Sequence, residues 1–207
     1  MEESQAQPSK IQSLLSSLTA EGIQNAARAM TEMIGETFTV TDPNISSVKF
    51  TEIPQILGGP ENDAVGIYLR IEGNISGQIM LIVPYSKALE LADLLMGEPI
   101  GTTQSLGRIE RSALAELGNL TGSFFLNAIA DSTGVYVRPS PPAVIVDMVG
   151  AIMDIILATC DILSEEVLLI HAKFVRNGRE TQANFWIIPD NTTVNTLMEK
   201  ATQDYEG

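Results

Sequence analysis

Residues that build disulfide-rich or metal-binding proteins are nearly absent from this sequence. Its 207 residues include a single cysteine, Cys160, and a single histidine, His171. The chain therefore has neither a disulfide framework nor a cluster of soft metal ligands. Basic residues are scarce as well, because 12 lysines and arginines stand against 26 aspartates and glutamates, for a formal net charge of -14. This charge repels phosphate backbones, so nucleic acid is not an expected partner.

Uncharged hydrophobic runs are also short. In the most apolar region, residues 143–170, the run is interrupted by Asp147, Asp154 and Asp161, whereas a membrane-spanning helix needs about 20 apolar residues. The N-terminal segment MEESQAQPSK is polar and acidic and lacks the basic-then-apolar order of an export signal. We therefore expect a cytoplasmic protein without membrane insertion. Hydrophobic residues still make up 44% of the chain, enough to bury a core in one domain or in two fused halves.

Helical and extended patterns alternate along the chain. Apolar spacing of three and four predicts helices at residues 9–34, 84–96, 108–134, 147–159 and 191–203. Strand patterns occur at residues 37–41, 48–53, 64–72, 77–83 and 135–138, with hairpin turns at Gly73-Asn74 and Asn177-Gly178. Residues 55–63 are predicted to form a loop, and Gly35 to end the first helix in a left-handed conformation. The chain is thus expected to mix helices and strands, with a proline corner at RPSPP.

The two halves of the chain, about residues 9–100 and 105–203, resemble each other. The apolar strand QIMLIVP in the first half is echoed by ANFWIIP in the second. A shift of 99 positions aligns three pairs of residues, which are Gly35 with Gly134, Pro43 with Pro142, and Ser13 with Ser112. Three matches at one spacing indicate an internal duplication within a single domain of residues 1–207.

One predicted helix, which contains the segment SALAELGNLTGSFF, has a polar stripe. At about 100° per residue, that stripe carries Ser112, Glu116, Asn119 and Ser123. The apolar side, expected to face the core, carries Leu117, Leu120, Phe124 and Ala128. Every amphipathic helix has a polar stripe, so the spacing alone does not distinguish a functional pair from ordinary solvated residues.

Two glycines interrupt the same helix. Gly118 and Gly122 each cost about 1 kcal/mol relative to alanine in a helix interior. We expect that cost to be offset by the close approach of a neighbouring backbone, which a glycine pair permits.

The pattern Ser112-x3-Glu116-x2-Asn119-x22-Pro142 resembles, spacing included, the active-site signature of the CheC/CheX/FliY family of chemotaxis phosphatases. The following segment, PSPPAVIVDMVGAIMDIIL, agrees as well, and the resemblance extends over essentially the whole chain. It implies an α+β fold of CheC-like type, internally duplicated with pseudo-twofold symmetry. The central sheet would be largely antiparallel, with the two long helices packed together.

Relatives of the CheC type commonly carry this signature once in each half, and the present sequence departs from that pattern. The 99-residue shift places Ser17 and Ala20 in the positions that correspond to Glu116 and Asn119. A hydroxyl and a methyl group cannot replace a carboxylate and a carboxamide, so one working site is expected. Asn25 is expected to cap or to pack rather than to catalyse.

The resemblance implies dephosphorylation of the response regulator CheY, whose own site holds the aspartyl phosphate and a Mg²⁺ ion. The phosphatase would need no cofactor of its own. Asn119 would orient the attacking water, and Glu116 would pair with a cationic side chain of CheY. Ser112 is either an ordinary surface hydroxyl or a supporting contact with the partner. Pro142 is expected to end a strand before the next helix, because proline fixes φ.

A second partner surface is implied by the segment after Pro142. Asp147, Asp154 and Asp161 recur every seven residues, which on a straight helix keeps them close to one edge. They either mark the wet edge of a buried helix or belong to a binding surface. In the family this helix resembles a receptor helix and binds the deamidase CheD, so Asp147 is the candidate for a CheD contact.

Two functional hypotheses follow, an enzyme and a binding module. The first is a CheY-phosphate phosphatase with one site. The alternative is a non-catalytic or weakly catalytic adaptor that binds and regulates CheD. A flagellar switch component is disfavoured, because FliY-like members add a C-terminal switch domain and the chain ends at residue 207. CheX-like members are shorter and are usually built around one signature.

Overall fold

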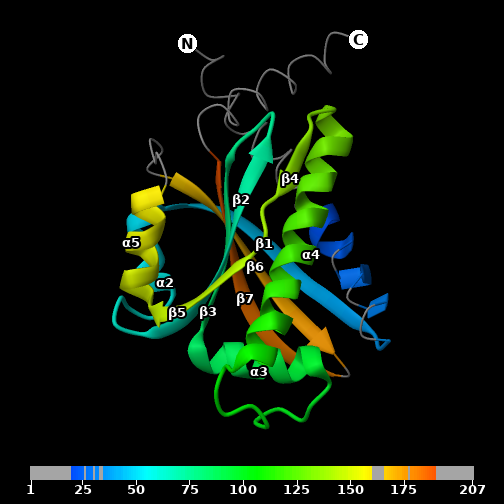
Figure 1. Cartoon of the computed structure of the whole chain (residues 1–207), viewed down its shortest axis with the longest axis vertical. Helices are drawn as coiled ribbons and strands as arrows, with labels where there is room; N and C mark the ends of the chain where they lie inside the picture. The colour runs from blue at the N-terminus through cyan, green and yellow to red at the C-terminus, as the bar shows by residue number, and fades with distance from the viewer. Residues whose placement is uncertain are drawn as a thin grey trace.

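A sheet with helices on both faces forms the body of the protein (Figure 1). The computed structural model describes residues 20–25, 27–29, 31–32, 35–159, 166–176 and 178–189. Helical residues between 20 and 32, α3 (Tyr85–Met96) and α4 (Arg108–Thr133) pack on one face, and α2 (Ile53–Ile56) and α5 (Val149–Thr159) pack on the other. The predicted α+β class is confirmed.

The sheet has seven strands, and every strand pair in the described part of the chain is antiparallel. The strands are β1 (Phe38–Lys49), β2 (Asp63–Gly73), β3 (Gly77–Pro84), β4 (Val137–Pro139), β5 (Ala143–Met148), β6 (Glu166–Arg176) and β7 (Arg179–Pro189). Their order is β1-β6-β7-β3-β2-β4, and β5 also pairs with β2. The largely antiparallel sheet expected from the sequence is therefore present.

The central strands are buried on both faces. In β2, Val65, Ile67 and Leu69 belong to the core cluster shared with α3 and α4. Ala64 and the half-buried Tyr68 alternate with them along the strand; Ala64 belongs to the cluster formed with α2 and α5, and Tyr68 packs against it. Because successive residues of a strand point to opposite faces, this arrangement makes one strand serve two cores. It also holds α4 with its apolar side on the sheet and its other side away from it.

Strands from the two predicted halves are interleaved. β1, from the first half, pairs with β6 from the second, while β4 and β5, from the second half, pair with β2 from the first. Phe38 lies opposite Arg176, and Val137, 99 positions after Phe38, lies opposite Gly73 at the end of the other hairpin. The internal duplication stays a prediction, and these registers agree with it.

The edge formed by β4 and β5 is broken at the proline corner. Ser140 fills the break: its N–H donates to the carbonyl of Arg70 at 2.8 Å, and its hydroxyl accepts the Arg70 N–H at 2.9 Å. Pro141 and Pro142, which have no N–H to donate, lie where strand pairing with β2 stops. Pro142 therefore precedes the strand β5 and is not followed directly by a helix, so that prediction was wrong.

The region between residues 37 and 63 also differs from the prediction. The strands expected at 37–41 and 48–53 form one strand, β1, with an irregular register between Thr41 and Asn44. Residues 50–56, expected to be strand and loop, are helical, in η1 (Phe50–Glu52) and α2. Phe50, Ile53 and Leu57 are buried, and their spacings of three and four residues match the helical period. The segment is too short for this pattern to be recognised in the sequence.

Other predicted elements agree with the structure. The β2–β3 and β6–β7 hairpins, α3 and α4 lie where the sequence placed them, and helical residues begin at 20 in the described part of the first helix. Gly35 has φ +75°, and its N–H bonds the Thr31 carbonyl at 2.9 Å, so the predicted left-handed helix end is confirmed. Residues 9–19 and the predicted helix at 191–203 lie outside the described residues.

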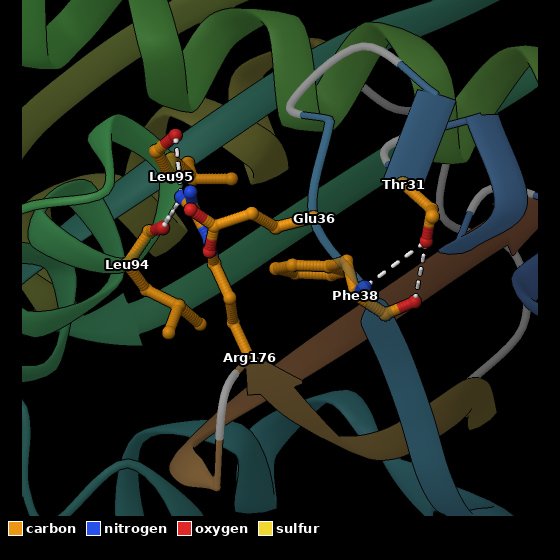
Figure 2. Close-up of polar contacts among 6 residues, drawn as sticks. All are labelled: Thr31, Glu36, Phe38, Leu94, Leu95 and Arg176. Carbon is orange, nitrogen blue, oxygen red and sulfur yellow. Dashed lines mark hydrogen bonds and ion pairs between the residues drawn. The ribbon is translucent and has the colours of Figure 1, made fainter.

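An arginine at the end of β6 joins three segments (Figure 2). The buried Arg176 donates to the carbonyl oxygens of Leu94 and Leu95 in the last turn of α3, and its Nε lies 3.0 Å from a carboxylate oxygen of Glu36. A cation at a helix C-terminus interacts favourably with the helix dipole. This side chain therefore fixes α3 to the sheet and to the segment that follows the first helix.

Backbones of the two long helices meet at a glycine, but not at the predicted pair. A Cβ on Gly22 would lie 2.7 Å from the Cα of Phe125 and 3.1 Å from its backbone nitrogen. No side-chain rearrangement can relieve contacts with backbone atoms, so a residue larger than glycine must push the first helix away from α4. Gly22 is thus the residue that allows these helices to touch.

Gly22→Ala should lower the free energy of unfolding by about 1–2 kcal/mol, because overpacking outweighs the gain in helix propensity. Urea unfolding followed by circular dichroism measures the change. Gly122→Ala is the matched control, since its Cβ would meet only side-chain carbons, the nearest a methyl of Leu69 at 3.3 Å. We expect that variant to lie within about 1 kcal/mol of wild type. A more stable Gly22→Ala protein would contradict the contact.

Candidate functional site

The polar stripe of α4 is accessible to solvent. Ser112 and Glu116 are exposed, and Asn119 and Ser123 are half-buried. In the described part of the chain, the side chains of Ser112, Glu116 and Asn119 form no hydrogen bond or ion pair with other residues. The amide of Asn119 is therefore neither sealed in the core nor occupied by a structural role.

The opposite side of α4 lies on the sheet, as predicted. Leu117 and Ala128 are buried, whereas Leu120 and Phe124 are half-buried. The two glycines of this helix also face the sheet. A Cβ on Gly118 would lie 2.5 Å from Cγ2 of Ile67.

The prediction that a neighbouring backbone approaches Gly118 and Gly122 was wrong. Side chains of β2, and not a neighbouring backbone, occupy the space beside them: Ile67 at Gly118 and Leu69 at Gly122. Because the glycines have no side chains, α4 can pack closely against Ile67 and Leu69. The glycines therefore set the distance of α4 from the sheet, while the polar stripe on the other side stays accessible to solvent.

The loop before α4 is tied down by a buried carboxylate. Asp93, in α3, accepts backbone N–H bonds from Gly101 at 2.7 Å, Thr102 at 3.2 Å and Thr103 at 2.9 Å. Burial raises the pKa of the Asp93 carboxyl, but hydrogen bonds from the Thr103 side chain and from these three amides outweigh burial, and the pKa lies below its ordinary value. The ionised carboxylate thus holds residues 101–103 and fixes where the chain enters α4.

The segment that carries Pro142 runs beside α4. Pro142 is half-buried, and Val144 and Val146 of β5 pack against the core cluster that also contacts Ala113 and Leu120 of α4. All four residues of the predicted signature are therefore on α4 or on the segment next to it. Their proximity comes from the pairing of β4 and β5 with β2, on which α4 lies.

Asp147 lies in a strand and not in the helix where it was predicted. It is the residue before the last of β5, opposite Ala64, and α5 begins only at Val149. Asp147 is exposed, and its carboxylate accepts the N–H of Met148 at 2.8 Å. Asp154 is exposed on α5, and Asp161 lies outside the described residues. A strand advances about twice as far per residue as a helix, so the seven-residue spacing does not place Asp147 on the edge of α5.

The corresponding positions in the first helix are only partly described. Ala20 is helical and half-buried, as is Asn25, whereas Ser13 and Ser17 lie outside the described residues. The expectation of a single working site rests on the residue types and stays a prediction.

The described residues provide neither a cluster of metal ligands nor a membrane-spanning helix. No group of three or more histidine, cysteine, aspartate or glutamate side chains among them could hold a metal ion. None of the helices in this part of the chain is both long and apolar enough to cross a bilayer.

Comparison with known proteins supports the resemblance seen in the sequence. Residues 109–146, which contain Glu116, Asn119 and Pro142, match the CheC-like family. The chain is also similar to the CheY-P phosphatase CheC of Bacillus subtilis (strain 168), with 28% identity over 173 residues, or 82% of this chain and 83% of that protein. The resemblance to CheC-like chemotaxis phosphatases is thereby confirmed.

Solved structures show the same fold. The crystal structure of Thermotoga maritima FliY superposes with a TM-score of 0.71 and 17% identity, covering 93% of this chain and 96% of the chain in that structure. The FliM middle domain of Vibrio alginolyticus superposes with a TM-score of 0.61 and 12% identity, covering 90% of this chain and 98% of that one. At these identities the similarity concerns the fold alone. It confirms the CheC-like architecture expected from the sequence.

Proposed function

We propose that this protein dephosphorylates the phosphorylated response regulator CheY at the polar stripe of α4. The observation that carries the proposal is the half-buried amide of Asn119, which has no partner among the described residues. It lies in the segment that matches the CheC-like family, in a chain similar to a CheY-P phosphatase. An amide that serves no structural role on an accessible helix face is available to a visiting protein.

The chemistry asked of Asn119 is the positioning of water. A carboxamide donates and accepts hydrogen bonds at once, so it can hold a water molecule in line with the phosphorus atom. Attack of that water breaks the bond between phosphorus and the aspartyl oxygen of CheY, which releases inorganic phosphate and the free carboxylate. The Mg²⁺ ion belongs to the regulator, and this chain contributes no cofactor.

Glu116 is proposed to dock the regulator. Its carboxylate is exposed and lies one turn before Asn119 on the same stripe, so it can pair with a cationic side chain of CheY while the amide enters the phosphoryl pocket. Ser112, exposed one turn earlier, would support the same contact. Partners of this kind imply a cytoplasmic location.

The direct test is the loss of phosphate from phosphorylated CheY with and without the full-length protein. Catalytic amounts should accelerate the loss, with release of one phosphate for each regulator. An unchanged rate at saturating concentrations would overturn the phosphatase proposal. Repeating the assay with CheD separates the enzyme from the adaptor, since an adaptor binds CheD without turnover of the phosphorylated regulator.

A second candidate function, binding of CheD, is favoured by the surface around α5. Met148, Ile155 and Leu157 are exposed large hydrophobic residues, and the carboxylates of Asp147 and Asp154 are exposed near them in sequence. Single exposed apolar residues are common, but three within ten positions at one strand–helix junction are suited to a protein partner.

Asp147→Lys should weaken CheD binding about tenfold, because it places a cation where the surface is acidic. Titration calorimetry with CheD measures this loss. Dephosphorylation of CheY should stay within about twofold of wild type, because Asp147 lies next to the end of β5 that leads into α5, which packs in the other core cluster from α4. Equal loss of both activities would show that the substitution acts through the fold instead.

A further inference from the structure

We propose that the first turn of α4 is a docking anchor that selects the partner of the Asn119 stripe. Ile109 would fill an apolar recess, and Arg108 would contact an acidic surface, beside the phosphoryl pocket of phosphorylated CheY. The inference rests on the proposed function and adds two specificity residues that the signature does not contain.

Ile109 is unusually exposed for its type. Its relative exposure of 68% is the highest among the large hydrophobic residues of the described chain. On a helical projection it lies about 20° from Glu116, so it shares the polar stripe. A rise of 1.5 Å per residue places it about 15 Å from Asn119 along the axis. It is therefore an apolar group at one end of a stripe that otherwise carries two serines, a carboxylate and one amide.

The positive charge of Arg108 is unfavourable at its position in the helix. This arginine is the first residue of α4, where the helix dipole favours anions, as Glu110 in the same turn illustrates. Arg108 is exposed, and it forms no ion pair with residues that the structure describes. Arg111, by contrast, donates its Nε to the Leu106 carbonyl at 3.0 Å and so has a local structural role. No contact among the described residues explains the cation at position 108.

The charge of the whole molecule indicates what Arg108 contacts. With a formal net charge of -14, the protein repels an acidic partner at most of its surface. A phosphorylated aspartate pocket is itself anionic. Arg108 lies on the same side of α4 as Asn119, about 20° away in projection, and offers a positive charge at the end from which such a partner can be oriented. Ile109 beside it supplies the apolar contact that anchors most protein interfaces.

The loop tied by Asp93 fixes both residues in space. Residues 101–103 are held by the Asp93 carboxylate, and Leu106, just before α4, is buried. Arg108 and Ile109 are therefore presented from an anchored helix start. This matters because an interface anchor loses affinity when its backbone must first be ordered.

The test is steady-state dephosphorylation of CheY by Ile109→Ser and Arg108→Gln proteins. Each substitution should raise KM about tenfold and leave kcat within about twofold, because the anchor acts equally in the ground state and the transition state. The Arg108→Gln defect should shrink in high salt, since screening removes the wild-type advantage. Arg108→Gln should also raise the midpoint of thermal unfolding slightly, because it removes a charge that opposes the helix dipole.

Ile56→Ser is the matched control, because Ile56 is an exposed isoleucine in α2, on the other side of the sheet. It should leave KM unchanged. Titration of CheY bound to beryllofluoride and Mg²⁺ measures docking without turnover, and both anchor variants should bind it about tenfold more weakly. Wild-type affinity and KM in Ile109→Ser and Arg108→Gln would overturn the anchor and leave the phosphatase proposal standing. If the wild-type protein does not dephosphorylate CheY, the phosphatase proposal is overturned. If, in addition, the variants bind the beryllofluoride form of CheY as tightly as wild type, the anchor is overturned as well.

Discussion

Replacing Asn119 with alanine should lower the rate of CheY dephosphorylation by about 100-fold, the effect of removing one positioned group from a transition state. The loss should appear in kcat, because the amide acts on the water and not on the docking of the regulator. The fold should be unaffected. Alanine has a higher helix propensity than asparagine, and the amide of Asn119 bonds to no described residue, so the free energy of unfolding should rise by a few tenths of a kcal/mol, about 0.5 at most.

The same helix offers a matched control for this substitution. Asn127 is exposed on α4, two turns beyond Asn119, and it lies outside the predicted signature. Asn127→Ala makes the same chemical change in the same helix and should leave the rate within about twofold of wild type. Single-turnover assays on phosphorylated CheY compare the two variants. A rate for Asn119→Ala within about twofold of wild type would rule out a water-positioning role for that amide.

Replacing Asp93 with asparagine should cost about 3 kcal/mol of unfolding free energy at neutral pH. The carboxylate accepts hydrogen bonds from the amides of residues 101–103, and bonds to a charged acceptor contribute more than neutral ones. An asparagine side chain has one acceptor oxygen and presents N–H donors where a second acceptor stood. Urea unfolding of both proteins measures the difference.

The cost should depend on pH. The folded-state pKa of Asp93 is lowered, so its contribution is fully present above the unfolded-state pKa of about 3.9 and is lost as the pH falls through the folded-state value. The difference between wild type and Asp93→Asn should therefore be smaller in acid, below the unfolded-state pKa, than at neutral pH. Asp131→Asn makes the same chemical change at an exposed position near the end of α4 and should alter the unfolding free energy at neutral pH by less than about 0.5 kcal/mol. A difference of equal size at both pH values would mean that the ionised carboxylate is not its source.

Consequences of the Asp93 change should extend to docking. Residues 101–103 lead to the start of α4, so a loosened loop should raise KM for the regulator more than it lowers kcat. That pattern would resemble the anchor variants and not Asn119→Ala. Stability and docking would then be coupled through the same carboxylate.

Much of the site could be read from local sequence. The polar stripe, the apolar side of α4 and the helix ends at glycine depend on spacing within about four residues, and the structure has them where the sequence placed them. The two hairpins were also predicted correctly, because a turn and its two flanking strands are neighbours in the chain. Asp93 was not recognised, although an acid among the apolar residues of α3 was the available signal.

The elements that were mistaken depend on distant partners. Residues 147–148, predicted to begin the helix, instead end a strand, because residues 143–148 pair with the edge of β2. Residues 50–56 pack as short helices because the sheet face above them is already apolar. The glycines of α4 likewise face Ile67 and Leu69, about 50 residues away in sequence, which no local pattern can indicate.

The sequence by itself determined which side chains share the outer stripe of α4 and which residues end its helices, because helical periodicity and glycine conformation are local properties. Tertiary structure alone decided how closely α4 lies on β2, that β5 is a strand with Asp147 near its end, and that Asp93 holds the entry to α4. Those features arise from contacts between segments that only packing brings together, and packing depends on the shape of the whole core.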